Sequence, residues 1–147
     1  MPETSLTADV IARLAAEVTD LRSVDGAASF TTLVSRNAMP ANTPAAHVLL
    51  GTLRGGTSDA MTGVFTQSVT EGISIILTLR PNDRLGSRAI EPIEGLKNDV
   101  IAALAGWAPG EEVGVFALVS GQPVSFANGL LVYRLDFALA DQLRILS

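Results

Sequence analysis

The spacing of apolar side chains predicts a helix near the start of this chain. Between residues 6 and 21, apolar residues recur every three or four positions and form one stripe, as in a helix with one face on a core. The stripe consists of Val10, Ile11, Leu14, Val18 and Leu21. This pattern indicates an amphipathic helix over the whole of residues 6–21.

Residues 27–37 are ambiguous. Three apolar side chains have helical spacing, but the run from Phe30 to Val34 is also rich in strand-forming residue types. We favour a short helix here. The two prolines that follow, Pro40 and Pro44, predict a loop, because each disfavours helical backbone in the residue before it.

A third stretch with helical spacing precedes the single tryptophan, Trp107. Its apolar positions are Ile90, Ile93, Leu96, Val100 and Leu104. Pro92 lies near its start, so the helix either begins at this proline or is kinked there. Gly106 and Pro109 predict its end, because glycine closes many helices and proline cannot continue one. We expect Trp107 to plug the core rather than to stack on a ligand.

The pattern of apolar and polar residues predicts four strands. Alternation is clearest over residues 65–80, whereas consecutive apolar residues at 48–50 indicate a strand over residues 45–53 that is buried on both faces. Two more strands are expected over residues 113–120 and 130–140. In the last strand, every second residue is apolar, namely Leu131, Tyr133, Leu135, Phe137 and Leu139. One face of this strand should therefore lie on the core.

Small and polar residues predict the connections between these strands. Residues 54–62 include two consecutive glycines and indicate a mobile loop or arm between paired strands. Residues 121–123 and 128–129 have the composition of turns, with a short extra strand at residues 124–126. The tail, residues 142–147, exposes apolar side chains unless something covers it.

Together these elements predict the α+β class. We expect a mainly antiparallel or mixed sheet of about four strands, packed on one side by two main helices. The length suits one domain that spans residues 1–147.

The composition favours association with other protein. Apolar residues make up 48 % of the 147 residues and charged ones 17 %, and the mean hydropathy is +0.37. No apolar run approaches the roughly 20 residues of a membrane-spanning helix, so we expect self-association and no membrane partner. The net charge of −5 disfavours binding to phosphate backbones, which needs clustered lysine and arginine.

No residue pattern predicts catalysis, a cofactor or a metal site. The chain has no cysteine, and its single histidine, His47, lacks the partners of a zinc site or a catalytic dyad. Residues 51–58 lack the lysine of a phosphate-binding loop, and the carboxylates at 111–112 would point to opposite faces of a strand. Arg134 and Asp136 share one face of the last strand and predict a cross-strand or intersubunit ion pair.

Two short motifs, taken in the order of the expected elements, carry a resemblance. Thr-Pro-Ala-Ala-His-Val-Leu at residues 43–49 follows the first helices, and Leu-Ala-Gly-Trp-Ala-Pro at residues 104–109 ends the last one. The strand around residues 69–75 lies between them, and the strand at 130–139 follows. In this order, over nearly the whole chain, they resemble the tail terminator proteins of tailed bacteriophages, prophages and gene transfer particles.

This resemblance implies a structural virion protein without enzyme activity or cofactor. Such proteins form a hexameric ring that caps the tail tube, stops its polymerisation and faces the neck of the head. The implied partners are further copies of the chain, the major tail tube protein and a neck or head-completion protein. Double-stranded DNA passes through the lumen without specific binding. The protein would be made in the cytoplasm of the bacterial host and located at the head–tail junction of the virion.

The resemblance also suggests which segments meet a neighbouring subunit or the tube. We expect these contacts from the loop at residues 54–67, from the closing strand and from the apolar tail. The candidates are Arg54, Gly55, Gly56, Asp59, Met61, Phe65, Arg134, Asp136, Leu143 and Ile145. Two alternatives stay open: another head–tail connector or tail-completion protein, and a small-ligand-binding α+β domain.

Overall fold

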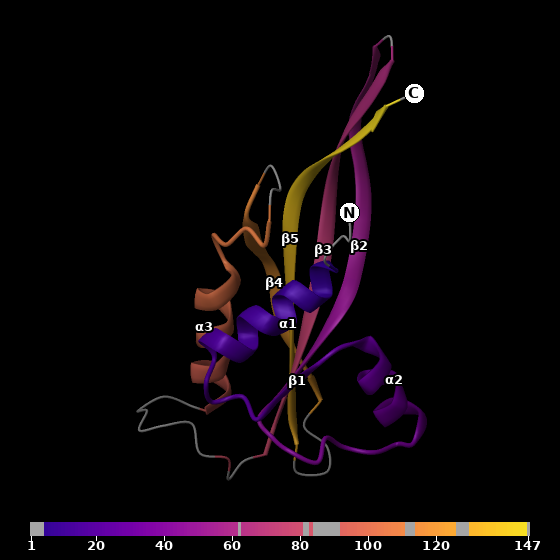
Figure 1. The fold of residues 1–147 in the computed structure, drawn as a ribbon. Helices are drawn as coiled ribbons and strands as arrows, with labels where there is room; N and C mark the ends of the chain where they lie inside the picture. The colour runs from indigo at the N-terminus through magenta and orange to yellow at the C-terminus, as the bar shows by residue number, and fades with distance from the viewer. Residues whose placement is uncertain are drawn as a thin grey trace.

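The computed structural model describes residues 5–61, 63–80, 83, 92–110, 114–125 and 130–146. These residues form three helices and five strands (Figure 1). The helices are α1 (Leu6–Glu17), α2 (Ala27–Ser35) and α3 (Pro92–Leu104). The strands are β1 (Ser23–Asp25), β2 (Ala45–Met61), β3 (Val64–Leu79), β4 (Phe116–Ser125) and β5 (Leu131–Leu146). None of the helices in the described part of the chain is long and apolar enough to cross a membrane.

All five strands belong to one mixed sheet, in the order β1-β2-β3-β5-β4. β1 runs parallel to β2, and the other neighbours are antiparallel. The β3–β5 pair is the longest, because it holds one register from Val64 opposite Leu146 to Leu79 opposite Leu131. The α+β class and the mixed sheet are therefore confirmed, with β1 as an additional strand.

The core lies between one face of this sheet and the helices α1 and α3. The stripe predicted for α1 is buried at Val10 and Leu14, and α3 buries Leu96, Val100 and Leu104. On the sheet, the predicted apolar face of β5 is buried at Leu135, Phe137 and Leu139. Alternate residues of β3 are buried beside them, at Ile73, Ile75, Leu77 and Leu79. Burial of these side chains is the main stabilising contribution, about 1.5–3 kcal/mol for each large one.

The helix α2 lies against the opposite face of the sheet. His47 of β2 faces α2, because its ring lies 5.4 Å from that of Phe30, whereas its neighbours Ala46 and Val48 belong to the core. Both faces of the sheet therefore carry a helix, but only α1 and α3 close a core. No residue of α2 is buried.

The end of α3 is fixed by Gly106 and Trp107. Gly106 has a left-handed backbone with φ of +81°, and its N–H donates to the carbonyl of Phe116 at 2.8 Å. The Phe116 N–H in turn donates to the carbonyl of Trp107 at 2.9 Å. The indole stacks on the Phe116 ring at 6.1 Å, and the guanidinium of Arg13 lies 5.1 Å from the indole centre. Trp107 is therefore a plug between α1, α3 and β4, as predicted.

Several predicted boundaries were wrong. Residues 54–61 of the expected loop are instead the second half of β2, which pairs with β3 up to Met61 with a register shift after Gly55, and residue 62 lies outside the described residues. The turn expected at residues 121–123 lies inside β4, where Pro123 occupies an edge position that tolerates its missing N–H. The tail is also strand, because β5 continues through residue 146.

The first helix is shorter than the pattern suggested. α1 ends at Glu17, because Val18 adopts a non-helical backbone and its N–H closes the last turn on Leu14. The short helix favoured over residues 27–37 is confirmed as α2, and Pro92 is the first residue of α3. Ile90, the carboxylates at 111–112 and the turn at 128–129 lie outside the described residues.

We predict that Gly106→Ala lowers the free energy of unfolding by about 1–2 kcal/mol, the cost of a left-handed backbone in an L-residue. No atom would crowd an added Cβ at this position, so backbone strain is the sole expected effect. Gly106→Asn is the matched control, because asparagine tolerates this conformation better. Equal losses for the two variants in urea unfolding would contradict this reading.

Candidate assembly interface

Beyond the helices, three strands continue as a projecting arm. We define the arm as Leu50–Met61 of β2, Val64–Gly72 of β3 and Ala140–Leu146 of β5 (Figure 1, upper part). Every predicted contact residue except Arg134 and Asp136 lies on this arm. The sequence therefore located the segment, although it predicted a loop where the structure has paired strands.

The arm projects because the strands are much longer than the helices. β3 and β5 each have 16 residues, which corresponds to about 50 Å of extended chain. α1 has 12 residues and α3 has 13, which corresponds to about 20 Å of helix. Two helices of this length cannot cover the whole sheet face, and Figure 1 shows the arm extending past both of them.

One face of the arm continues the core face and is mainly apolar. Directly opposed residues of an antiparallel pair point to the same face, and Leu50 opposes the core residue Ile73. Following the register outward, the apolar side chains on this face that stay at least partly exposed are Leu50, Leu53, Ala60, Phe65, Leu143 and Ile145, which we call the arm face. Val69 lies among them but is buried. Four polar or charged residues interrupt the arm face: Ser58, Gln67, Glu71 and Asp141. Leu53 is 65 % exposed and Ile145 55 %, so this face lacks the cover that the helices give farther down.

The other face of the arm is mainly polar. It carries Arg54, Asp59, Thr66, Ser68, Gln142 and Arg144, and its large apolar side chains, Met61, Val64 and Leu146, lie at the tip. Alternation of this kind is typical of a sheet with one face against protein and one against water. The arm face therefore has the pattern of a surface that another protein element covers.

Most of the outer sheet edge is unsuited to pairing with another strand. β4 has a register shift after Leu118 and contains Pro123, and β2 has shifts after Leu50 and Gly55. Bulges and prolines of this kind keep sheet edges from pairing with other chains. The end of β5 differs, because Asp141–Leu146 is in unbroken register with β3 and no described strand pairs with its outer side.

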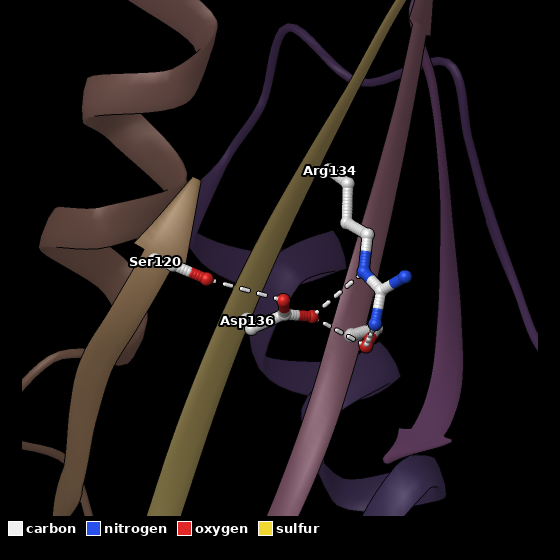
Figure 2. A network of polar contacts seen from close by, with 4 residues as sticks. Ser120, Arg134 and Asp136 are labelled. Atoms are coloured by element: carbon white, nitrogen blue, oxygen red, sulfur yellow. Dashed lines mark hydrogen bonds and ion pairs between the residues drawn. The ribbon is translucent and has the colours of Figure 1, made fainter. Parts of the chain in front are cut away.

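Arg134 and Asp136 lie below the arm, on the sheet face that α2 partly covers. Asp136 accepts hydrogen bonds from Ser74 at 2.6 Å, from the Arg134 Nε at 2.9 Å and from Ser120 at 3.3 Å (Figure 2). The Arg134 Nη2 also donates to Ser74 at 3.3 Å. The ion pair therefore forms within β5, and the prediction of a cross-strand or intersubunit pair was wrong. The hydrogen bonds from Ser74 and Ser120 are what tie β3 and β4 to β5 (Figure 2).

The network lowers the pKa of Asp136. Burial by itself raises the pKa of this carboxyl, but the hydrogen bonds from Ser74, Arg134 and Ser120 and the charge of Arg134 outweigh it. A carboxyl whose pKa is lower in the folded chain stabilises the fold above its unfolded pKa. That contribution is lost as the pH falls through the folded value.

A groove of about 400 Å³ lies between α2 and the sheet, which we call the α2 groove. Its lining contains no Asp, Glu, Lys or Arg, and consists of Phe30, Leu33, Val34, Asn37, Ala38, Met39, Pro40, His47, Ile76, Thr78, Val124, Leu130 and Val132. His47 is 1 % exposed, and neither ring nitrogen has a hydrogen-bond partner among the described residues. Burial lowers the pKa of His47, against the opposing charge of Asp25, so the imidazole is neutral at pH 7.

Sequence reasoning did not find this groove. The run from Phe30 to Val34 predicts secondary structure alone, ambiguous between helix and strand, and the sequence offers no ligand partners for His47. No local pattern could have indicated it, because the groove depends on the tertiary fold that brings the rings of Phe30 and His47 to 5.4 Å from each other. Across the described ranges, no cluster of three His, Asp or Glu side chains is placed to hold a metal ion.

An uncovered apolar arm and an open apolar groove are typical of a protein that works by assembly with other proteins. The chain matches the family model described as phage tail terminator protein over residues 5–145, and it belongs to that family. It is accordingly a structural protein of a phage-type virion tail, as the resemblance implied.

The fold agrees with this assignment. A chain of the virion of a native gene transfer agent particle shares the fold, with a TM-score of 0.59 at 14 % sequence identity. The alignment covers 95 % of this chain and 96 % of that chain. No curated protein matches the chain by sequence.

We predict that Asp136→Asn lowers the free energy of unfolding at pH 7 by about 1 kcal/mol or less, because the pair is partly exposed. Below about pH 4 the unfolding free energy of the variant should fall less steeply with pH than that of the wild type. The reason is that the variant has no Asp136 carboxylate whose stabilising contribution protonation could remove. Urea unfolding at pH 7 and pH 3 measures both effects. Parallel pH profiles for the variant and the wild type would contradict the network's role.

Proposed function

We propose that this chain, as one tail-terminator-like domain, forms a hexameric ring that caps the tail tube and ends its polymerisation. The ring then joins the tail to the neck of the head. The observation that carries the proposal is the arm face, an apolar sheet surface that the chain's own helices leave uncovered. In a family of tail terminators, a surface of this kind has other virion proteins as its natural partners.

A ring needs two different patches on each copy. Contact between one patch and a different patch on the neighbour repeats by rotation, and it closes when the rotation does. The arm face and the α2 groove are two such patches on one chain. The remaining arm surface, including the tip at Met61, is available for the tail tube protein.

The charge of the chain suits passage of DNA rather than its binding. The net charge is −5, and the face of the arm opposite the arm face mixes Arg54 and Arg144 with Asp59. Tight, salt-sensitive attachment to a phosphate backbone requires clustered cations instead. Double-stranded DNA would therefore cross the lumen without specific contacts, and the chain's part is structural rather than enzymatic.

We predict that Leu143→Glu leaves the isolated chain folded but weakens ring formation at least tenfold. Leu143 is 44 % exposed, so the charge is tolerated in the monomer, but burial of that charge in an interface is costly. Gln142→Glu is the matched control, because the neighbouring side chain points to the polar face. Sedimentation velocity and negative-stain micrographs measure assembly, and thermal unfolding measures the fold. Wild-type assembly by Leu143→Glu would remove the arm face from the account.

Particles that lack this protein distinguish its function from that of other connectors. We predict tails of excessive length or long polytubes in electron micrographs, because nothing stops polymerisation of the tube. Tails of normal length that fail to attach to heads would instead indicate a connector or tail-completion role. Restoring the wild-type chain should restore tail length.

A further inference from the structure

The helix α2 lacks the packing that normally stabilises a short helix. It has nine residues, and helices of this length depend on tertiary contacts rather than on their own propensity. Its apolar side chains line the α2 groove, yet none is buried, and Val34 is 63 % exposed. The α2 groove is thus an apolar surface that no other described part of the single chain covers.

The end of β5 has the features of an element that covers such a surface. Leu143 and Ile145 point to the arm face and are exposed. Its outer side has no strand partner in the described ranges, so its backbone N–H and C=O groups are available. The outer edges of β2 and β4, in contrast, are broken by register shifts. Compared with the outer edges of β2 and β4, the end of β5 is therefore an unbroken strand edge that also carries exposed apolar side chains.

The two surfaces cannot meet within one chain. Figure 1 shows the end of β5 at the top of the arm and α2 beside the lower end of the sheet. The unbroken β3–β5 register holds the arm extended away from α2. A second copy is therefore the occupant that fits, and the contact joins unlike surfaces, as a ring requires.

The dimensions and the polar groups of the two surfaces also correspond. α2 is about 13 Å long, and the four residues Leu143–Leu146 span about 13 Å as a strand. The groove offers apolar walls for two side chains and one unpartnered imidazole, that of His47. A strand with free backbone groups supplies the hydrogen bond that this buried ring lacks.

We infer that the end of β5 of one copy, Asp141–Leu146, binds in the α2 groove of a second copy, with a backbone group bonded to His47. This inference rests on the proposed ring and adds the identity of both contacting surfaces. Repeated around the ring, each copy gives its arm to one neighbour and receives the arm of the other.

Cysteine cross-linking tests the contact directly, because the chain has no cysteine of its own. A chain with both Val34→Cys and Ile145→Cys should give a ladder of disulfide-linked oligomers up to the size of the ring. Each single variant should give dimers at most. The matched control combines Ile145→Cys with Ala16→Cys, which places the second thiol on the exposed side of α1. This control pair should give no ladder.

The outcomes separate this contact from the ring itself. Rings in micrographs without a ladder would overturn the contact and leave the ring intact. An equal ladder from the control pair, or a disulfide closed within one chain, would also overturn the contact. If the wild-type chain never forms rings, alone or with tail tube protein, the proposed function fails and the contact with it.

His47→Phe tests the role of the imidazole. The change keeps an aromatic ring beside Phe30 but removes two buried, unpartnered nitrogens. We predict that His47→Phe raises the melting temperature of the dilute monomer and weakens assembly at least tenfold. If His47 had a purely structural role, the melting temperature and the strength of assembly would instead rise together or fall together. Unchanged assembly would remove the hydrogen bond to His47 from the inference.

Discussion

The pairing of β3 with β5 is the constraint on which the rest of the structure depends. It holds one register along 16 residues of each strand, so the sheet is far longer than the two helices that cover it. Near its centre the sheet buries a normal core against α1 and α3. Farther out the same alternation continues without a helix, and the apolar side chains of the arm face meet water. An excess of strand over helix is thus the physical origin of the assembly surface.

The same sheet produces a second uncovered surface at its other end. α2 packs on the face opposite the core, buries none of its residues and leaves a groove above His47. Between the two surfaces, Arg134, Asp136, Ser74 and Ser120 fasten three strands together. A chain with unlike apolar surfaces at its two ends fits the closed ring proposed above, and the chain belongs to the tail terminator family.

The sequence predicted those features that depend on local pattern. The parity of β5, the stripe of α1 and the exit of α3 at Gly106 all follow from spacing and residue type, and all are confirmed. The second half of β2 was missed because Gly55, Gly56 and their small polar neighbours favour loops by themselves. Only pairing with β3 makes them strand. β1 has three residues and exists through parallel pairing with β2, and the groove exists through the distance between α2 and His47. Such features depend on contacts that are remote in sequence.

Hydrogen–deuterium exchange of the backbone amides tests the central claim, that assembly covers the arm and the groove. We predict that the outward-facing amides of the end of β5, which no described strand covers in the single chain, become strongly protected in assembled rings. Amides of α2 should become protected at the same time, because the groove is filled by the neighbouring copy. Amides of the core strands should change little. Rings in which the end of β5 and α2 exchange as fast as in the monomer would contradict the account.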